Sequence, residues 1–346
     1  MALTRRCFLA VGSSSILVAA TAGCGHVGPK TAGASSAYNE LFSVQRKGAK
    51  GQILVLMPAT PQTKEVWTGL SDELGKSYDL TAVEVATKSD VDIVRTALER
   101  HRPVAIVLMN NPTVAAYAEY QRSCPPNTQF PAAVIVMTSF LDGQPNVIQN
   151  GTGIAYEIPL ITVVTNLRKV LATPMHRIGV VRRAQLRTFV ERQAKLAAHE
   201  KIQVEQEEVG PSPNPSELKR ALRLVRQRSD ALWVLNDDHL LSPRLIVEAW
   251  LPGVTERPWI PTIVGAAPLV LPGESFGTFA VLPDHTALGV QAASLLFDLA
   301  DEDWKIEPGA RIALPVSTTT TLDLPQVKER FTLRDGALSQ VDKILK

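Results

Sequence analysis

The chain lacks several features that would place it in a special class of protein. Its 346 residues include only three cysteines, too few for a scaffold held together by disulfides. Aromatic residues make up 5% of the chain, and no apolar run approaches the roughly 20 residues that a membrane-spanning helix needs. Basic and acidic residues nearly balance, with 36 Lys and Arg against 34 Asp and Glu. The chain as a whole therefore has no electrostatic signature of a nucleic-acid-binding protein.

What the chain does have is enough length and apolar content to fold. Hydrophobic residues make up 45% of the sequence and charged residues 20%, which is ordinary for a globular protein and excludes a chain that is disordered throughout. Single hydrophobic cores stop growing at about 250–300 residues. The length therefore predicts two domains.

The N-terminal segment has the anatomy of an export signal. Residues 1–23 begin with a positive charge cluster, continue through a modestly apolar stretch at 8–20, and end in small residues. Residues 4–9 read TRRCFL and resemble the twin-arginine export signature. Removal of the segment would take away Arg5 and Arg6, which leaves 34 basic residues against 34 acidic ones and a neutral mature chain.

Two cleavage sites compete in this segment. The AGC at 22–24 resembles the end of a lipobox, in which Cys24 would be lipidated and anchor the chain in a membrane. The ATA at 20–22 suits ordinary signal peptidase and would release a soluble protein. We expect a periplasmic, lipid-anchored protein, and Gly25 in place of aspartate resembles lipoproteins of the outer membrane, which favours that membrane over the inner one. Residues 24–50 are rich in Gly, Ala, Ser and Lys and predict a flexible tether.

From residue 51 onward, short apolar segments alternate with amphipathic helices, and the series occurs twice. Continuous apolar runs such as 52–57 and 132–137 are typical of parallel strands that are buried on both faces. Ile53 in the first series corresponds to Ile178 in the second, and Asn110 to Asn236. The expected strands are 52–57, 80–86, 103–109, 132–137, 177–181, 203–209, 231–235 and 259–264, and the expected helices are 64–76, 90–101, 114–122, 186–200, 215–228 and 241–250.

This repetition predicts an α/β protein with two doubly wound, Rossmann-like parallel sheets joined by a hinge. A strand at 279–282, a helix at 286–299 and a strand at 311–316 remain, and they suggest that the chain returns to the first lobe. In such a protein the ligand crevice lies between the lobes, beyond the carboxyl ends of the strands. The expected divisions are a signal peptide at 1–23, the tether at 24–50, lobe 1 at 51–165, lobe 2 at 166–280, and a return to lobe 1 with a C-terminal tail at 281–346.

The motifs that would make this chain an enzyme mostly fail. Residues 273–277 match the G-x-S-x-G string of a hydrolase, but prolines precede Ser275 and a strand-like segment follows it, where a nucleophile elbow needs a strand and then a helix. The stretch 69–77 has one residue too many between its glycines for a phosphate loop. Residues 237–239 (DDH) suit a helix cap or a ligand contact better than a cation site. We therefore predict no catalytic residues, no metal and no cofactor.

The second series carries a resemblance to a known family. The segments that carry it are 177–181, 215–228, 231–238, 260–264, 279–284 and 288–293. They are similar to the type 1 periplasmic binding fold, and within it to the family of ABC-transporter substrate-binding proteins that includes tryptophan- and phenylalanine-binding lipoproteins. In the first series, NGTGI at 150–154 resembles that family's Asn-x-Thr-Gly segment, which leads to the crossover between lobes.

The resemblance implies a clamshell that closes on a small ligand and delivers it to a membrane permease or a sensor. Arg182 would pair with a ligand carboxylate and Asp237 with an amine, which suits a small polar or amino-acid-like ligand. Candidate contacts are the residues just past the strand ends, namely Thr60, Gln62, Asn110, Asn111, Thr138 and Ser139 in lobe 1, and Arg182, Asn236, Asp237 and Ala266 in lobe 2.

Two other functions remain as alternatives. An envelope lipoprotein could keep this fold and act on another envelope protein without transport. An esterase could use Ser275. Stabilisation by a small molecule would favour the solute-binding hypothesis over the protein-interaction hypothesis.

Overall fold

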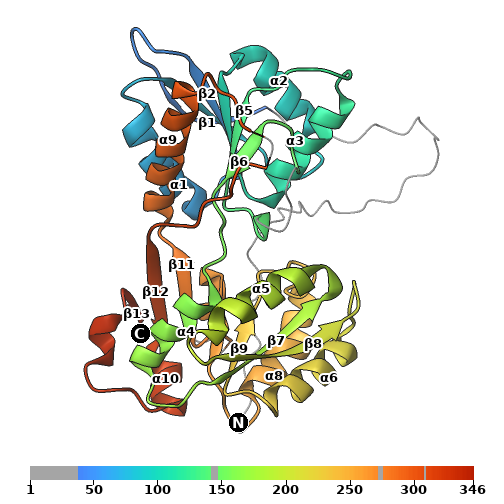
Figure 1. The fold of residues 1–346 in the computed structure, drawn as a ribbon, viewed down its shortest axis with the longest axis vertical. Helices are drawn as coiled ribbons and strands as arrows, with labels where there is room; N and C mark the ends of the chain where they lie inside the picture. Colours follow the sequence, from blue (N-terminus) through green and yellow to red (C-terminus); the bar gives the residue numbers. More distant parts are fainter. Residues whose placement is uncertain (1–37, 142–146, 272–275, 308) are drawn as a thin grey trace, which may run out of the picture. The chain divides into compact units, whose positions relative to one another are not determined.

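The computed structural model describes residues 38–141, 147–271, 276–307 and 309–346 (Figure 1). The signal segment, Cys24 and Ser275 lie outside these residues. Within them the chain forms two sheets, each covered by helices on both faces, as the sequence predicts.

The first sheet has six strands in the order β1-β3-β2-β4-β5-β6, and all its pairs are parallel except that of β1 with β3. Alternate residues of the apolar run in the central strand point to opposite faces, so Ile53 and Val55 face one core and Leu54 and Leu56 the other. The strands are β1 (Glu40–Val44), β2 (Gln52–Met57), β3 (Asp79–Glu84), β4 (Ala105–Met109), β5 (Ala132–Val136) and β6 (Gly151–Gly153).

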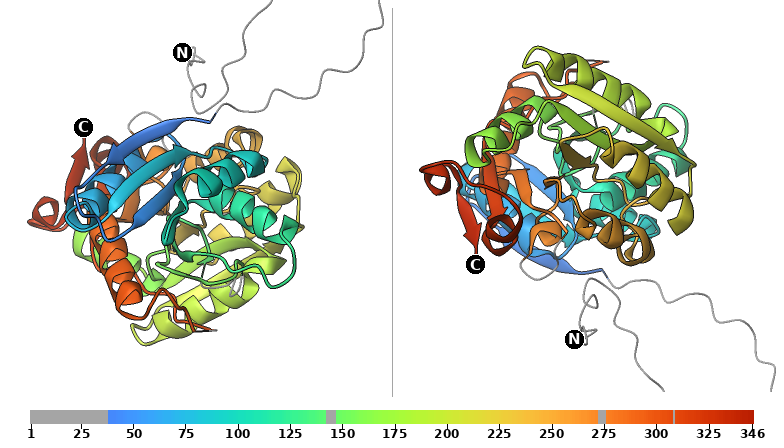
Figure 2. Two further views of the ribbon diagram at one scale, coloured as in Figure 1. Left: turned by 90° about the horizontal axis from the view of Figure 1, so that it is seen from above. Right: turned by 90° about the horizontal axis from the view of Figure 1, so that it is seen from below.

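Two pairs of helices cover this sheet. Helices α1 (Pro61–Leu74) and α9 (His285–Asp301) pack on one face, and α2 (Val91–His101) and α3 (Asn111–Ser123) on the other (Figure 2, left). Helices α1 and α9 approach closely because both have glycine at the contact. A Cβ on Gly69 would lie 2.0 Å from the carbonyl oxygen of Thr286, and one on Gly289 would lie 2.1 Å from that of Val66.

The strand β1 corrects the tether prediction, because Glu40–Val44 lies inside the segment 24–50. Its backbone pairs with β3, and the Phe42 ring stacks on Trp67 of α1 at 5.6 Å. These five residues belong to the first sheet. The compositional signal misses them because one half-buried strand among Gly, Ala and Ser residues barely changes the average.

The second sheet has seven strands in the order β13-β12-β11-β10-β9-β7-β8, with only β12 antiparallel to its neighbour β11. Helices α4 (Leu160–Val170), α5 (Arg187–Ala198) and α10 (Leu324–Arg330) cover one face, and α6 (Pro215–Arg226), α7 (Pro243–Leu245) and α8 (Leu251–Thr255) the other. The strands are β7 (Arg177–Arg183), β8 (Gln203–Val209), β9 (Ala231–Val234), β10 (Thr262–Val264), β11 (Phe279–Pro283), β12 (Thr318–Asp323) and β13 (Lys343–Leu345).

The C-terminal part of the chain is divided between the lobes differently from the prediction. Helix α9 does return to the first lobe, but β12, α10 and β13 complete the second. Of the strand expected at 311–316, only Ala313 pairs with the first sheet, through a bridge to Ile154. Helix α4 packs in the second lobe because its apolar face meets the core of that sheet, so the boundary expected at 165 falls earlier. The chain thus crosses between the lobes after β6, after β11 and before β12. None of the helices in the described ranges is long and apolar enough to span a bilayer.

Candidate ligand-binding site

A cavity of about 670 Å³ lies where strands of both sheets reach their carboxyl ends. Its walls come from the residues that follow β4 and β5 in the first lobe, and from the end of β7, the start of α5 and the loop after β9 in the second. This volume is within the range of small-molecule sites. The lining residues are Asn111, Ser139 and Phe140 from the first lobe, and Arg183, Gln185, Leu186, Thr188, Phe189, Arg192, Asn236, Asp237, Asp238 and His239 from the second.

A buried ion pair forms one wall of this cavity. The Nε and Nη2 atoms of Arg183 each lie 2.7 Å from a carboxylate oxygen of Asp237, and both side chains are buried. The Nη1 atom donates to the carbonyl oxygen of Pro211 at 3.1 Å. With the amide of Gln185 oriented toward Arg183, its oxygen accepts from both terminal nitrogens at 2.6 and 2.9 Å. The charges of Arg183 and Asp237 therefore satisfy each other inside the protein.

Two asparagines line the cavity from opposite lobes, and in each of them one amide atom already forms a hydrogen bond within the protein. Asn111 accepts a hydrogen bond at Oδ1 from the backbone N–H of Ser139 at 3.0 Å, so its amide nitrogen remains to donate. Asn236 donates from Nδ2 to the carbonyl oxygen of Gly265 at 2.9 Å. Its Oδ1 is buried and has no hydrogen-bond partner among the described residues. Burying an acceptor without a partner is costly, so this atom points to a donor supplied by water or ligand.

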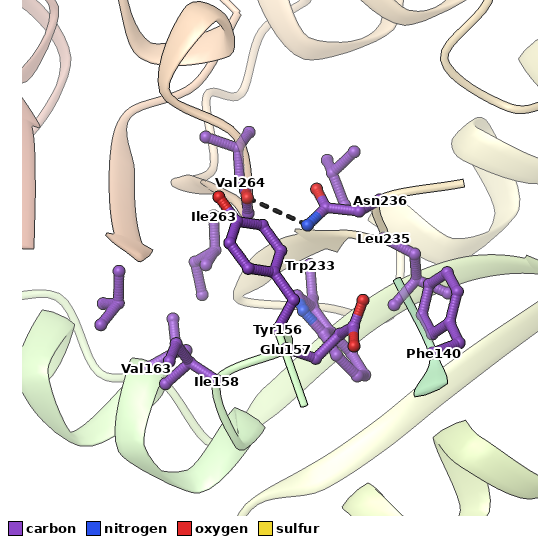
Figure 3. A pocket seen from close by; sticks show the side chains of 13 residues that line it. Phe140, Tyr156, Glu157, Ile158, Val163, Trp233, Leu235, Asn236, Ile263 and Val264 are labelled. Carbon is purple, nitrogen blue, oxygen red and sulfur yellow. Dashed lines mark hydrogen bonds between the residues drawn. The ribbon is translucent and has the colours of Figure 1, made fainter. Parts of the chain in front are cut away.

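Next to the cavity, a chamber of about 30 Å³ has room for one water molecule (Figure 3). It shares Phe140 and Asn236 with the larger cavity. Tyr156 and Glu157, from the first crossing between the lobes, and Trp233 of β9 also line it. The chamber therefore lies between the ligand cavity and the hinge.

Several solved structures have a similar fold and share little sequence with this chain. A complex of an ABC domain with L-Trp from Streptococcus pneumoniae is 17% identical, with a TM-score of 0.56 over 85% of this chain and 100% of that one. The ligand-free, open structure of a substrate-binding protein with adhesive properties from Clostridium difficile is 12% identical, with a TM-score of 0.61 over 86% and 99%. A conserved domain protein from Vibrio cholerae is 18% identical, with a TM-score of 0.55 over 86% and 100%.

The chain has the type 1 periplasmic binding fold. No family model and no curated protein matches the sequence. The two sheets, the three crossings and the cavity at the strand ends are thus the elements of that fold in this chain.

Four of the residues expected to contact ligand in this fold do line the cavity, namely Asn111, Ser139, Asn236 and Asp237. The other six lie elsewhere. Thr60 and Asn110 cap helices α1 and α3, where their side chains accept from the backbone N–H of Thr63 and Thr113. Gln62 lines a separate cavity of about 400 Å³, Thr138 is buried, and Ala266 precedes the short 3₁₀ helix Ala267–Val270.

Arg182 is the most informative of the six. Its side chain donates to Gln206 at 2.7 Å and pairs with Glu208, both on β8, and it does not line the cavity. Its neighbour Arg183 does, because successive side chains of a strand point to opposite faces. The sequence contains both arginines, but the exact end of the strand decides which one reaches the cavity.

The apolar wall of the cavity was not expected from the sequence. The Phe140 ring meets Phe189 edge to face at 5.0 Å, Phe189 lies 5.9 Å from Trp233, and the Arg192 guanidinium sits 5.8 Å from the Phe189 ring. Phe189 lies in the first turn of the helix expected at 186–200, and this position near the end of the preceding strand is the one sequence feature that indicates it. Phe140 directly follows the predicted contacts Thr138 and Ser139.

A hydrogen-bonded cluster joins the hinge to the first lobe. The hydroxyl of Tyr156 lies 3.0 Å from Nε2 of His285, and Nδ1 of His285 lies 2.9 Å from a carboxylate oxygen of Glu65. Burial, followed by the charges of Glu157 and Glu65, raises the pKa of Tyr156 to about 12. The tyrosine therefore stays neutral and can donate throughout the physiological pH range. In the described part of the chain, no three His, Cys, Asp or Glu side chains gather as metal ligands would.

Proposed function

We propose that this protein is a solute-binding protein that captures a small polar molecule in the 670 Å³ cavity. The observation that supports it best is that polar side chains of both lobes, including Asn111 and Asn236, line one cavity at the strand ends. Ligand pockets of α/β proteins lie at such ends. The role is binding rather than catalysis.

The mechanism follows from the placement of these side chains on two lobes. A ligand that contacts Asn111 and Asn236 together binds better when the lobes are closed, so it shifts the equilibrium toward the closed state. The crossings next to Tyr156 and His285 are the segments whose backbone would rotate. A permease or a sensor would then recognise the closed form.

The amino-acid-like ligand expected from the sequence loses part of its support. That expectation used Arg182 for the carboxylate and Asp237 for the amine. Arg182 lies outside the cavity, and Asp237 is bonded to Arg183. The Streptococcus pneumoniae structure contains L-Trp, so amino acids remain a class to be tested.

We also propose that the chain is exported and anchored through a lipid on Cys24. The support is the twin-arginine-like segment and the AGC at 22–24. Membrane fractionation and mass spectrometry of the chain with Cys24 and with Cys24→Ser would test it. Release of both forms into the soluble fraction would contradict the anchor without affecting the binding proposal.

The binding proposal is tested by thermal unfolding of the chain from residue 25 onward, with amino acids, nucleosides, nucleobases, sugars and small peptides. A ligand that binds only the folded state stabilises it by about 2.7 kcal/mol at a hundredfold excess over Kd, or a few degrees for a protein of this size. One class should give a saturable shift that Asn236→Leu weakens. Asn166→Leu, on α4 and outside the cavity, is the matched control and should keep the shift. A well-folded sample that responds to no class would overturn the proposal and favour a protein partner.

A further inference from the structure

The charged side chains of the cavity compensate one another. Two arginines and two aspartates line it. The buried pair Arg183–Asp237 has two short hydrogen bonds, and Gln185 and Pro211 occupy the remaining guanidinium N–H groups. Of the other two, Arg192 lies over the Phe189 ring, and Asp238 is exposed to solvent. The formal charges of these four lining side chains therefore sum to zero, and the buried pair among them is already satisfied.

This arrangement disfavours a charged ligand. An ion that leaves water needs a partner of opposite charge that is not already used, because the cost of desolvation is several kcal/mol per ion. Asp237 could bind an ammonium group, and Arg183 a carboxylate, only by breaking their mutual bonds. A neutral ligand requires neither the desolvation of an ion nor the breaking of the bonds between Arg183 and Asp237.

The two asparagines define what the neutral ligand must offer. Asn111 can donate from its amide nitrogen, since its Oδ1 accepts from Ser139, and the buried Oδ1 of Asn236 can accept one hydrogen bond, since its Nδ2 donates to Gly265. The ligand therefore needs an acceptor toward the first lobe and a donor toward the second. Hydroxyl groups can serve as either, so this fixed pattern discriminates most strongly among ligands with amide-like edges, whose donors and acceptors are fixed too.

The remaining wall is apolar and aromatic, formed by Phe140, Leu186 and Phe189. Flat heterocycles pack well on such surfaces, and carboxamide side chains recognise their edges by paired hydrogen bonds. Stacking of a base on an aromatic side chain contributes about 1–3 kcal/mol. The cavity of about 670 Å³ also leaves room for a sugar attached to the ring.

We propose that the ligand is a neutral heterocycle of the nucleobase or nucleoside class, held between the Asn111 amide nitrogen and the Asn236 amide oxygen. The proposal rests on the solute-binding function and specifies its ligand class. The charged pair Arg183–Asp237 then shapes the cavity wall without binding the ligand's charge.

The test is isothermal titration of the chain from residue 25 onward with uridine, thymidine, cytidine, adenosine, guanosine and their bases, beside tryptophan, phenylalanine, ribose and glucose. At least one nucleoside or base should bind, and the amino acids and sugars should not. Asn236→Leu and Asn111→Leu, on opposite lobes, should each raise Kd about tenfold or more, because each leaves a polar group of the ligand unpaired. Asn166→Leu should leave Kd unchanged.

The outcomes separate this proposal from the broader one. Binding of an amino acid or a sugar while all nucleosides and bases stay silent would overturn the ligand class and preserve the solute-binding function. Binding of a nucleoside that neither asparagine variant weakens would overturn the assigned contacts. No binding in any class would overturn both proposals. Circular dichroism of each variant shows that it is folded, and the panel on the unsubstituted chain decides the ligand class independently of them.

Discussion

The first lobe uses the polar side chains at its strand ends mainly to begin helices, whereas the second lobe directs them into the cavity. Thr60 and Asn110 follow β2 and β4, and their oxygens accept from the first turns of α1 and α3 at 3.3 Å. Arg183, Asn236 and Asp237 stand at comparable places in the second sheet and line the cavity. The first lobe contributes three lining residues and the second contributes ten.

This difference assigns different roles to two lobes of similar architecture. A side chain that caps a helix is bonded before any ligand arrives, so it contributes to stability and little to selection. The second lobe therefore supplies most of the cavity wall, and the first lobe contributes Asn111, Ser139 and Phe140. Substitutions in the two lobes should affect binding and stability in different proportions.

The largest effect should come from Asp237→Ala in the second lobe. The change leaves the Arg183 guanidinium buried without its carboxylate, which typically costs about 3–5 kcal/mol. Unfolding in urea should show this loss. Asp238→Ala, one residue along and exposed, should change stability by less than about 0.5 kcal/mol.

A double substitution sharpens this prediction. Arg183→Met combined with Asp237→Leu removes both charges, and we expect it to recover most of the lost stability because no unpaired charge remains. A double variant that is less stable than Asp237→Ala would show that the pair stabilises the lobe beyond mutual neutralisation.

In the first lobe, the largest effect should come from Gly289→Ala at the contact of α9 with α1. The added Cβ would meet backbone atoms of Val66 and Leu70 at 2.1 and 2.7 Å, so the helices must separate. Overpacking of this kind typically costs about 1–3 kcal/mol. Gly253→Ala in α8 is the control, because its Cβ would meet only the Leu222 side chain at 3.2 Å. Equal losses for the two variants would contradict the close contact.

Much of this fold could be predicted from the sequence, because it depends on patterns that persist over many residues. The apolar runs of β2, β4 and β5 and the amphipathic spacing of α6 are long enough to outweigh local exceptions. The return of the chain to the second lobe could not be predicted. The threonines of β12 have a high strand propensity, but nothing local indicates which sheet a strand joins.

The site was harder to predict than the fold, because the identity of the lining residues depends on single positions at the strand ends. A shift of one residue at the end of β7 exchanges Arg182 for Arg183 between opposite faces of the strand. Likewise, Asn110 and Asn111 are adjacent, yet one caps α3 and the other lines the cavity. Composition and periodicity locate the strand end to within a residue or two, and the chemistry depends on which residue it is.

A smaller effect should come from Thr60→Ala, which tests the capping role in the first lobe. The side chain and Thr63 form a reciprocal capping box at the start of α1. Its loss should lower the free energy of unfolding by about 1 kcal/mol and leave the ligand Kd within twofold of the unsubstituted chain. Thr60→Ser should keep most of the stability. A tenfold change in Kd for Thr60→Ala would place this residue in the binding site after all.

The smallest effect should be a dependence of stability on pH that originates in the first lobe. Nε2 of His101 lies 2.6 Å from the hydroxyl of Tyr38, and burial lowers the pKa of His101 below its usual 6.5, against the opposing charge of Glu40. The folded state thus favours the neutral imidazole, while the unfolded chain takes up a proton near pH 6.5. The stability that this group contributes is complete above pH 6.5 and is lost as the pH falls below it. Urea unfolding between pH 7.5 and 5 should therefore show a steeper decline for the unsubstituted chain than for His101→Gln. Thr60→Ala introduces no titratable group, so its curve should run parallel to that of the unsubstituted chain.

The curve of His101→Gln decides the origin of the pH dependence. If this curve also runs parallel to that of the unsubstituted chain, the pH dependence originates elsewhere, and the contact between Tyr38 and His101 does not cause it.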